Sequence, residues 1–175
     1  MLTVISNLST IPEQMDVFYS KCKDLGYSNN VSAKRMKLDW LPSVCGNMWA
    51  LMNNDVVIGT GGCHAFEDGF RIQFRGCEIP GTDVKKSLAR GHWNSSTFRE
   101  LIPYQIKWAE TFGSDVLYIT TNIGTKNHRA MQLIAKQNML TFVRNDSIFN
   151  TDQTVWKFNS KKYFNVRSKI QTYVV

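Results

Sequence analysis

The chain has 175 residues, of which 43% are hydrophobic, 12% are aromatic and 20% are charged, and its formal net charge is +7. This composition excludes a disordered chain and suits a single domain over residues 1–175, and the positive charge favours an anionic partner. No apolar run approaches the ~20 residues of a membrane-spanning helix and no signal peptide opens the sequence, so we expect a cytoplasmic protein without membrane contact.

The first half of the sequence predicts two helices and a meander of strands. Residues 11–27 carry apolar side chains at three- and four-residue steps, the period of a helix that faces a core. Residues 32–41 form a shorter, basic helical segment that ends before Pro42. Strands are expected at residues 47–52, 55–59 and 70–79, and the second of these continues as a strand over residues 57–66. A lead-in strand is possible at residues 2–6.

The second half predicts helices that alternate with strands. A long amphipathic helix covers residues 96–112, and Pro103 inside it should kink the helix or split it in two. Residues 115–121 form a short apolar run that is typical of a central parallel strand. The remaining expected elements are a helix at residues 127–137 and strands at residues 142–149 and 153–158.

Residues 160–175 admit two interpretations. Phe164, Val166, Ile170 and Val174 alternate with polar residues, as in an edge strand or tail whose charges face water. The same segment places lysine and arginine between aromatic residues, which is a pattern of nucleic-acid binding. We favour the edge strand.

The order of these elements and one motif point to a known family. The helix at residues 127–137 matches the pattern N-x-x-A-x-x-L-Y-x-K-x-G-F at Asn127, Ala130, Leu133 and Lys136. With Ala130 and Leu133 expected on one side of that helix, the chain resembles the GNAT acyltransferases from its first helix to Phe158. The resemblance implies an α/β (α+β) fold: a mostly antiparallel central sheet with a parallel pair formed by its fourth and fifth strands, and helices on both faces.

The resemblance also implies acetyl-CoA as the cofactor. In the family a glycine-rich loop before the long helix binds the pyrophosphate through backbone N–H groups, helped by the positive amino end of the helix. Trp93 and Ser95 stand at glycine positions of that loop, and an indole that filled the groove at position 93 would exclude the cofactor. The candidate phosphate-binding residues are Arg90, Gly91, Asn94, Ser95 and Ser96, and the last two have the alternative role of helix caps.

In the family the fourth and fifth strands separate, and the pantetheine arm of acetyl-CoA lies between them like a further strand. In this chain the backbones of Cys77 and Ile79 would face the arm. Asn122 and Asn127 would bind its amides or its thioester end, and their alternative roles are turn and cap residues.

Acetyl transfer to an amine requires a base, and Glu78 is our candidate, directly or through water. The family tyrosine that serves as the acid falls on Ile134, which has no proton to give. We therefore expect an N-acetyltransferase, monomer or homodimer, that acts on an unidentified amine and has no metal site. The alternative is a catalytically inactive protein of this fold that binds an anionic partner, either nucleic acid or protein.

Overall fold

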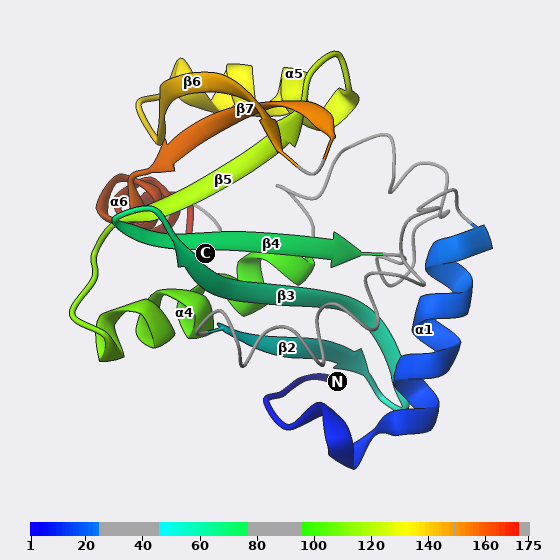
Figure 1. The fold of residues 1–175 in the computed structure, drawn as a ribbon. Coiled ribbons are helices and arrows are strands. Elements are labelled where there is room, and N and C mark those ends of the chain that lie inside the picture. The colour runs from blue at the N-terminus through cyan, green and yellow to red at the C-terminus, as the bar shows by residue number, and fades with distance from the viewer. Residues whose placement is uncertain (25–45, 77–95, 149, 172–175) are drawn as a thin grey trace.

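The computed structural model describes residues 1–24, 46–76, 96–148 and 150–171 (Figure 1). Its centre is a seven-stranded sheet in the order β1-β2-β3-β4-β5-β7-β6. Neighbouring strands are antiparallel except for β4 and β5, which are parallel. The predicted mixed sheet with one parallel pair is confirmed.

The strands fall close to the ranges predicted from the two-residue alternation. They are β1 Leu2–Ile5, β2 Gly46–Asn53, β3 Val56–Phe66, β4 Gly69–Gly76, β5 Leu117–Asn122, β6 Leu140–Ile148 and β7 Thr151–Phe158. The helices are the 3-10 turn η1 Leu8–Thr10, α1 Pro12–Asp24, α4 Ser96–Thr111, α5 Lys126–Ala135 and α6 Ser160–Gln171. The helix predicted at residues 32–41 lies outside the described residues.

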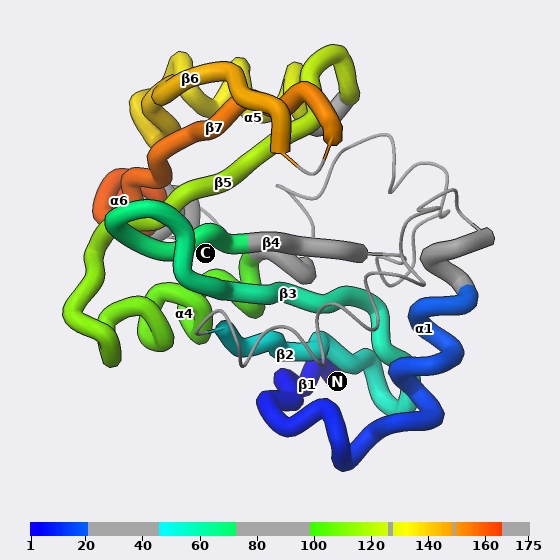
Figure 2. The backbone as a smooth tube through the Cα atoms, in the orientation of Figure 1, coloured from blue at the N-terminus to red at the C-terminus, as the bar shows by residue number. Residues whose placement is uncertain are grey.

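Helices cover both faces of the sheet, as predicted. On one face, Met15 and Phe18 of α1 pack with Met48 and Ala50 of β2, and we call this the α1 face. On the opposite face, the α4 face, a larger core gathers residues of α4, α5 and α6 against β2 to β7. Figure 2 shows that α5, β6 and β7 lie at the end of the sheet away from α1.

Helix α4 runs unbroken through Pro103, so the predicted split does not occur. Pro103 lies on the exposed side of the helix, where water can bond the carbonyl that loses its backbone partner. On the buried side, Gln105 donates from Nε2 to the carbonyl of Gly62 at 2.9 Å. A Cβ on Gly61 would lie 3.0 Å from Cδ1 of Leu101, so the glycine-rich part of β3 permits this close packing.

Residues 160–171 form the helix α6, and the predicted edge strand is therefore wrong. Asn159 begins the helix: its side chain accepts the backbone N–H of Lys162 at 2.9 Å, and its carbonyl accepts that of Tyr163 at 3.1 Å. The ring of Tyr163 is buried and packs on Phe158 with 5.6 Å between ring centroids.

The apolar residues of this segment fit two periods at once. Counted from Phe164 they recur at even steps, whereas Tyr163, Val166 and Ile170 recur at steps of three and four. The asparagine cap decides between the two, because it satisfies backbone N–H groups that a strand would have to pair with a neighbour. Among the described residues, no helix has both the length and the apolar character needed to cross a membrane.

Candidate functional site

Within the part of the chain that the structure describes, the parallel strands β4 and β5 pair only where they begin. They pair through Phe70 with Leu117 and through Arg71 with Tyr118, and the Phe70 N–H donates to the carbonyl of Val116 at 3.0 Å. Farther along, the described residues of β4 pair only with β3, and those of β5 only with β7. Figure 1 shows the two arrows diverging toward their carboxyl ends. The predicted separation of the fourth and fifth strands is confirmed.

We call the two paired rungs the apex, and the unpaired lengths beyond them the open segment. The approach at the apex is very close, because a Cβ added to Gly69 would lie 2.3 Å from the carbonyl oxygen of Val116. A residue without a side chain is therefore required where β4 enters the pair. Beyond the apex, no described strand pairs with the facing backbone edges of β4 and β5.

Two helices begin at the carboxyl ends of these strands. Helix α4 connects two parallel strands and must run antiparallel to them, so its amino end at Ser96 lies toward the carboxyl end of β4. Helix α5 follows β5 directly, and Thr125 is its cap: its Oγ1 accepts the His128 N–H at 3.2 Å and donates to the Asn122 carbonyl at 2.7 Å. Helix amino ends carry partial positive charge, and open α/β sheets bind ligands outside the carboxyl ends of their strands.

The two faces of the sheet differ chemically around the apex. On the α4 face, Ile72, Leu117 and Ile119 belong to the hydrophobic core. On the α1 face the side chains are polar: the buried Arg71 donates from Nη2 to Oε1 of Gln153 at 3.5 Å. Of the two faces, the α1 face is therefore the one that carries charged and amide side chains beside the apex.

Comparison with solved structures identifies the architecture. A protein from Desulfovibrio desulfuricans assigned to the GNAT family of acetyltransferases matches with a TM-score of 0.61 and 9% identity, over 91% of this chain and 99% of that one. The chain has the GNAT fold. A chimeric spermidine N-acetyltransferase of Vibrio cholerae matches with a TM-score of 0.58 and 12% identity, over 94% of this chain and 98% of that one.

A third match carries a ligand. It is a protein of Salmonella typhimurium, assigned as an acetyltransferase and solved with its cofactor acetyl-CoA, with a TM-score of 0.52 and 12% identity over 90% of this chain and 93% of that one. No protein-family model and no curated relative matches the sequence. Since the identities are low, the comparisons establish the fold, and the resemblance inferred from the sequence is confirmed at that level.

Most of the site residues predicted for the GNAT fold lie outside the described part of the chain. These are Cys77, Glu78, Ile79, Arg90, Gly91, Asn94 and Ser95, together with Trp93. Of the others, Ser96 is the first residue of α4. Asn122 is the last residue of β5, and its side chain is exposed. Asn127 is the second residue of α5, and its cap alternative is wrong because Thr125 fills that position.

The core-facing side of α5 is formed by Met131 and Ile134, which are both buried. Of the motif residues, Ala130 is half-buried and Leu133 is 61% exposed. Ile134, which stands where the family pattern has a tyrosine, is buried in this core and carries no proton that it could donate.

The buried tyrosine at the apex, Tyr118, is engaged in a hydrogen bond within the sheet. The Tyr118 hydroxyl donates to Oδ1 of Asp68 at 2.6 Å, and its ring packs on Phe66 with 5.5 Å between centroids. The hydrogen bond to Asp68, then burial, and then the negative charge of Asp68 raise the pKa of Tyr118 from 10.0 to about 12. A phenol that holds its proton this firmly is a poor donor and does not act as a base at neutral pH.

Sequence reasoning missed Thr120, the next residue of β5 on the α1 face. Its Oγ1 is buried, and among the described residues it has no hydrogen-bond partner. The signal in the sequence was only its two-residue spacing from Tyr118 and Asn122, which places all three on one face of the strand.

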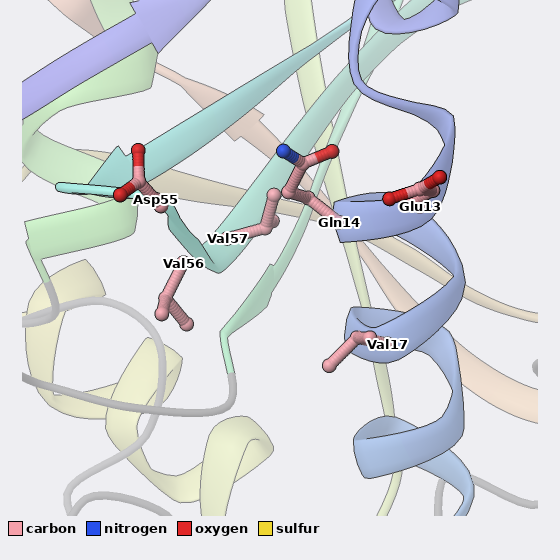
Figure 3. A pocket seen from close by; sticks show the side chains of 6 residues that line it. All are labelled: Glu13, Gln14, Val17, Asp55, Val56 and Val57. Carbon is pink, nitrogen blue, oxygen red and sulfur yellow. The ribbon is translucent and has the colours of Figure 1, made fainter.

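Two surface hollows lie away from the open segment. One of about 250 Å³ lies between α1 and the β2–β3 turn, where Gln14 and Val17 point toward Val56 and Val57 (Figure 3). The other, of about 290 Å³, lies beside the start of α6. Neither hollow is lined by a described residue of β4 or β5, so neither is part of the candidate site.

Proposed function

We propose that this protein is an N-acetyltransferase that binds acetyl-CoA along the open segment of β4 and β5 and transfers the acetyl group to an amine. The observation that carries the proposal is the parallel pair that stops after two rungs. Beyond these rungs, the described strands leave backbone groups unpaired on their facing edges, and the amides of a pantetheine arm can bond to such groups as an added strand would.

The positions of the helix ends support one direction for the proposed cofactor. The amino end of α4 favours the pyrophosphate at the carboxyl end of β4, beside the sequence from Arg90 to Ser96, so the thioester points back toward the apex. The net charge of +7 agrees with a ligand that carries several phosphates. The neighbour solved with acetyl-CoA supports the same choice of cofactor.

The transfer takes place on the α1 face, where the side chains are polar. The amine nitrogen attacks the thioester carbon, the carbon–sulfur bond breaks, and the departing sulfur takes up a proton. Glu78 remains our candidate for the base that removes the proton of the amine. Holding the two reactants together accounts for a large part of the rate, so the lack of a tyrosine at position 134 does not prevent the reaction.

Calorimetric titration with acetyl-CoA tests the proposal, with Ser96→Asp as the variant. We expect micromolar binding by the unmodified chain. Aspartate suits the start of a helix, so α4 should remain folded, but its charge repels the phosphates and should weaken binding by about tenfold or more. Ser160→Asp makes the same change at the first residue of α6 and should leave binding unaltered.

The inactive alternative predicts a different result. In that case acetyl-CoA does not bind, while short DNA or RNA binds with a steep dependence on salt, as expected when basic side chains displace counterions from phosphates. A screen of amines for release of free thiol from acetyl-CoA then distinguishes an enzyme from a protein that only binds the cofactor.

A further inference from the structure

Thr120 has a buried hydroxyl that the described part of the chain leaves without a hydrogen bond. Buried hydroxyls in native proteins nearly always have a partner, because burial without one costs free energy. Neighbouring threonines show how the sheet provides such partners. Thr121 Oγ1 accepts from Nε1 of Trp156 at 2.9 Å, and Thr154 Oγ1 donates to Oδ1 of Asn145 at 2.8 Å.

The position of Thr120 indicates where its partner comes from. It pairs with Val155 of β7 on one side, and on its other side β5 faces the open segment. It lies two residues beyond Tyr118, the last residue of the apex, which is roughly 7 Å along the strand. Its side chain belongs to the α1 face, the polar side on which the transfer is proposed.

The proposed orientation of acetyl-CoA brings its thioester close to Thr120. With the phosphates at the amino end of α4, the thioester lies at the inner end of the open segment, close to the apex. We propose that the Thr120 hydroxyl donates a hydrogen bond to the thioester carbonyl oxygen of bound acetyl-CoA and turns the carbonyl carbon toward the α1 face. The inference rests on the proposed function and names a binding residue of the same site.

A hydrogen bond to this oxygen also affects the reaction. Negative charge accumulates on the carbonyl oxygen when the amine attacks, so a donor at this position binds the transition state more tightly than the substrate. The loss of the hydroxyl should therefore lower kcat as well as the affinity for acetyl-CoA.

The test compares Thr120→Val, which keeps the shape but removes the hydroxyl, with Thr120→Ser, which keeps the hydroxyl. Calorimetry is done with acetyl-CoA and, separately, with CoA, which has no acetyl carbonyl. In Thr120→Val, acetyl-CoA should bind about three- to tenfold more weakly, as for the loss of one hydrogen bond, while CoA binds as before. Thr120→Ser should bind acetyl-CoA and CoA with the same ratio of affinities as the unmodified chain.

Stability gives an independent readout. Because no described residue bonds to this hydroxyl, Thr120→Val should leave the midpoint of denaturant unfolding unchanged or higher. The matched control is Thr154→Val, which breaks the bond to Asn145: its midpoint should fall and its ligand affinities should not change.

Three results would overturn the inference while the proposed function stands: unchanged acetyl-CoA binding by Thr120→Val, equal weakening for acetyl-CoA and CoA, or a midpoint lowered as in Thr154→Val. If the unmodified chain binds neither ligand, the proposed function fails and the inference fails with it.

Discussion

Tyr118 and Thr120 are adjacent on the same face of β5, but their hydroxyls have different roles. The Tyr118 hydroxyl is bound to Asp68 and fixes the β3–β4 turn against the sheet. The Thr120 hydroxyl lies beside the open segment, where the described residues offer it no partner. The first therefore contributes to the stability of the apex, whereas the second is assigned to the ligand.

Tyr118→Phe should change how stability depends on pH. The folded chain raises the pKa of this phenol from 10.0 to about 12, so its stabilising effect is fully present below pH 10 and is lost as the pH rises through 12. The variant lacks this loss, so its free energy of unfolding should decrease less than that of the unmodified chain over this window. Urea unfolding at several alkaline pH values measures the effect, and parallel curves for both proteins would contradict it.

Glu78→Gln tests the proposed base. The substitution keeps the size of the side chain but removes its basicity, so turnover should fall by roughly a hundredfold or more while acetyl-CoA affinity stays the same. The assay follows thiol release with the amine that the screen identifies. Glu67→Gln is the control, because this glutamate pairs with Arg144 on the surface and should leave turnover unaltered.

At the scale of elements, the apex is the feature on which the site depends. Two rungs hold β4 to β5, and they directly follow Gly69, whose backbone lies against Val116. Beyond them the described residues of β4 remain paired with β3, and those of β5 with β7.

Gly69→Ala should therefore destabilise the protein. Its Cβ would lie 2.3 Å from the Val116 carbonyl oxygen, so the strands have to shift, at a cost of roughly 1–3 kcal/mol. Gly62→Ala is the control, since its Cβ would lie 3.8 Å from the Asn47 carbonyl, an ordinary contact. Denaturant unfolding compares the two variants. Equal stability would show that the apex tolerates a side chain.

Much of the fold could be predicted because the strands and the long helix carry clear periods in the sequence. The failures have physical causes. In α6 the apolar spacing fits both periods, and a single asparagine cap decides the outcome. On α5 the motif predicted the helix but did not show that Met131 and Ile134 are the residues that face the core. No local pattern shows that the Thr120 hydroxyl lacks a partner, because that depends on strands far apart in the sequence.

At the scale of the whole molecule, the sheet consists of two blocks. One is β1 to β4, the other is β5, β7 and β6, and among the described strands only the two rungs of the apex join them. The α4 face adds a shared hydrophobic core. A ligand that bonds to both strand edges would connect the blocks over their remaining length.

Acetyl-CoA should therefore stabilise the whole domain and slow hydrogen exchange at the backbone amides of β4 and β5. At a free concentration of 100 times Kd, binding contributes about 2.7 kcal/mol to the free energy of unfolding. A rise in Tm and mass-spectrometric exchange measure the two effects. Protection confined to segments outside β4 and β5 would contradict the proposed binding mode.

The same geometry makes the two ends of the binding region unequal. A small rotation of one block about the apex hardly moves residues beside it, but its effect grows with distance along the strands. At Asn122, roughly 13 Å beyond the apex, a rotation of about 5° displaces the backbone by about 1 Å. The distance between β4 and β5 would thus stay nearly constant beside the reacting carbonyl. At the end of the open segment that is proposed to bind the phosphates, the same distance can adjust to the cofactor.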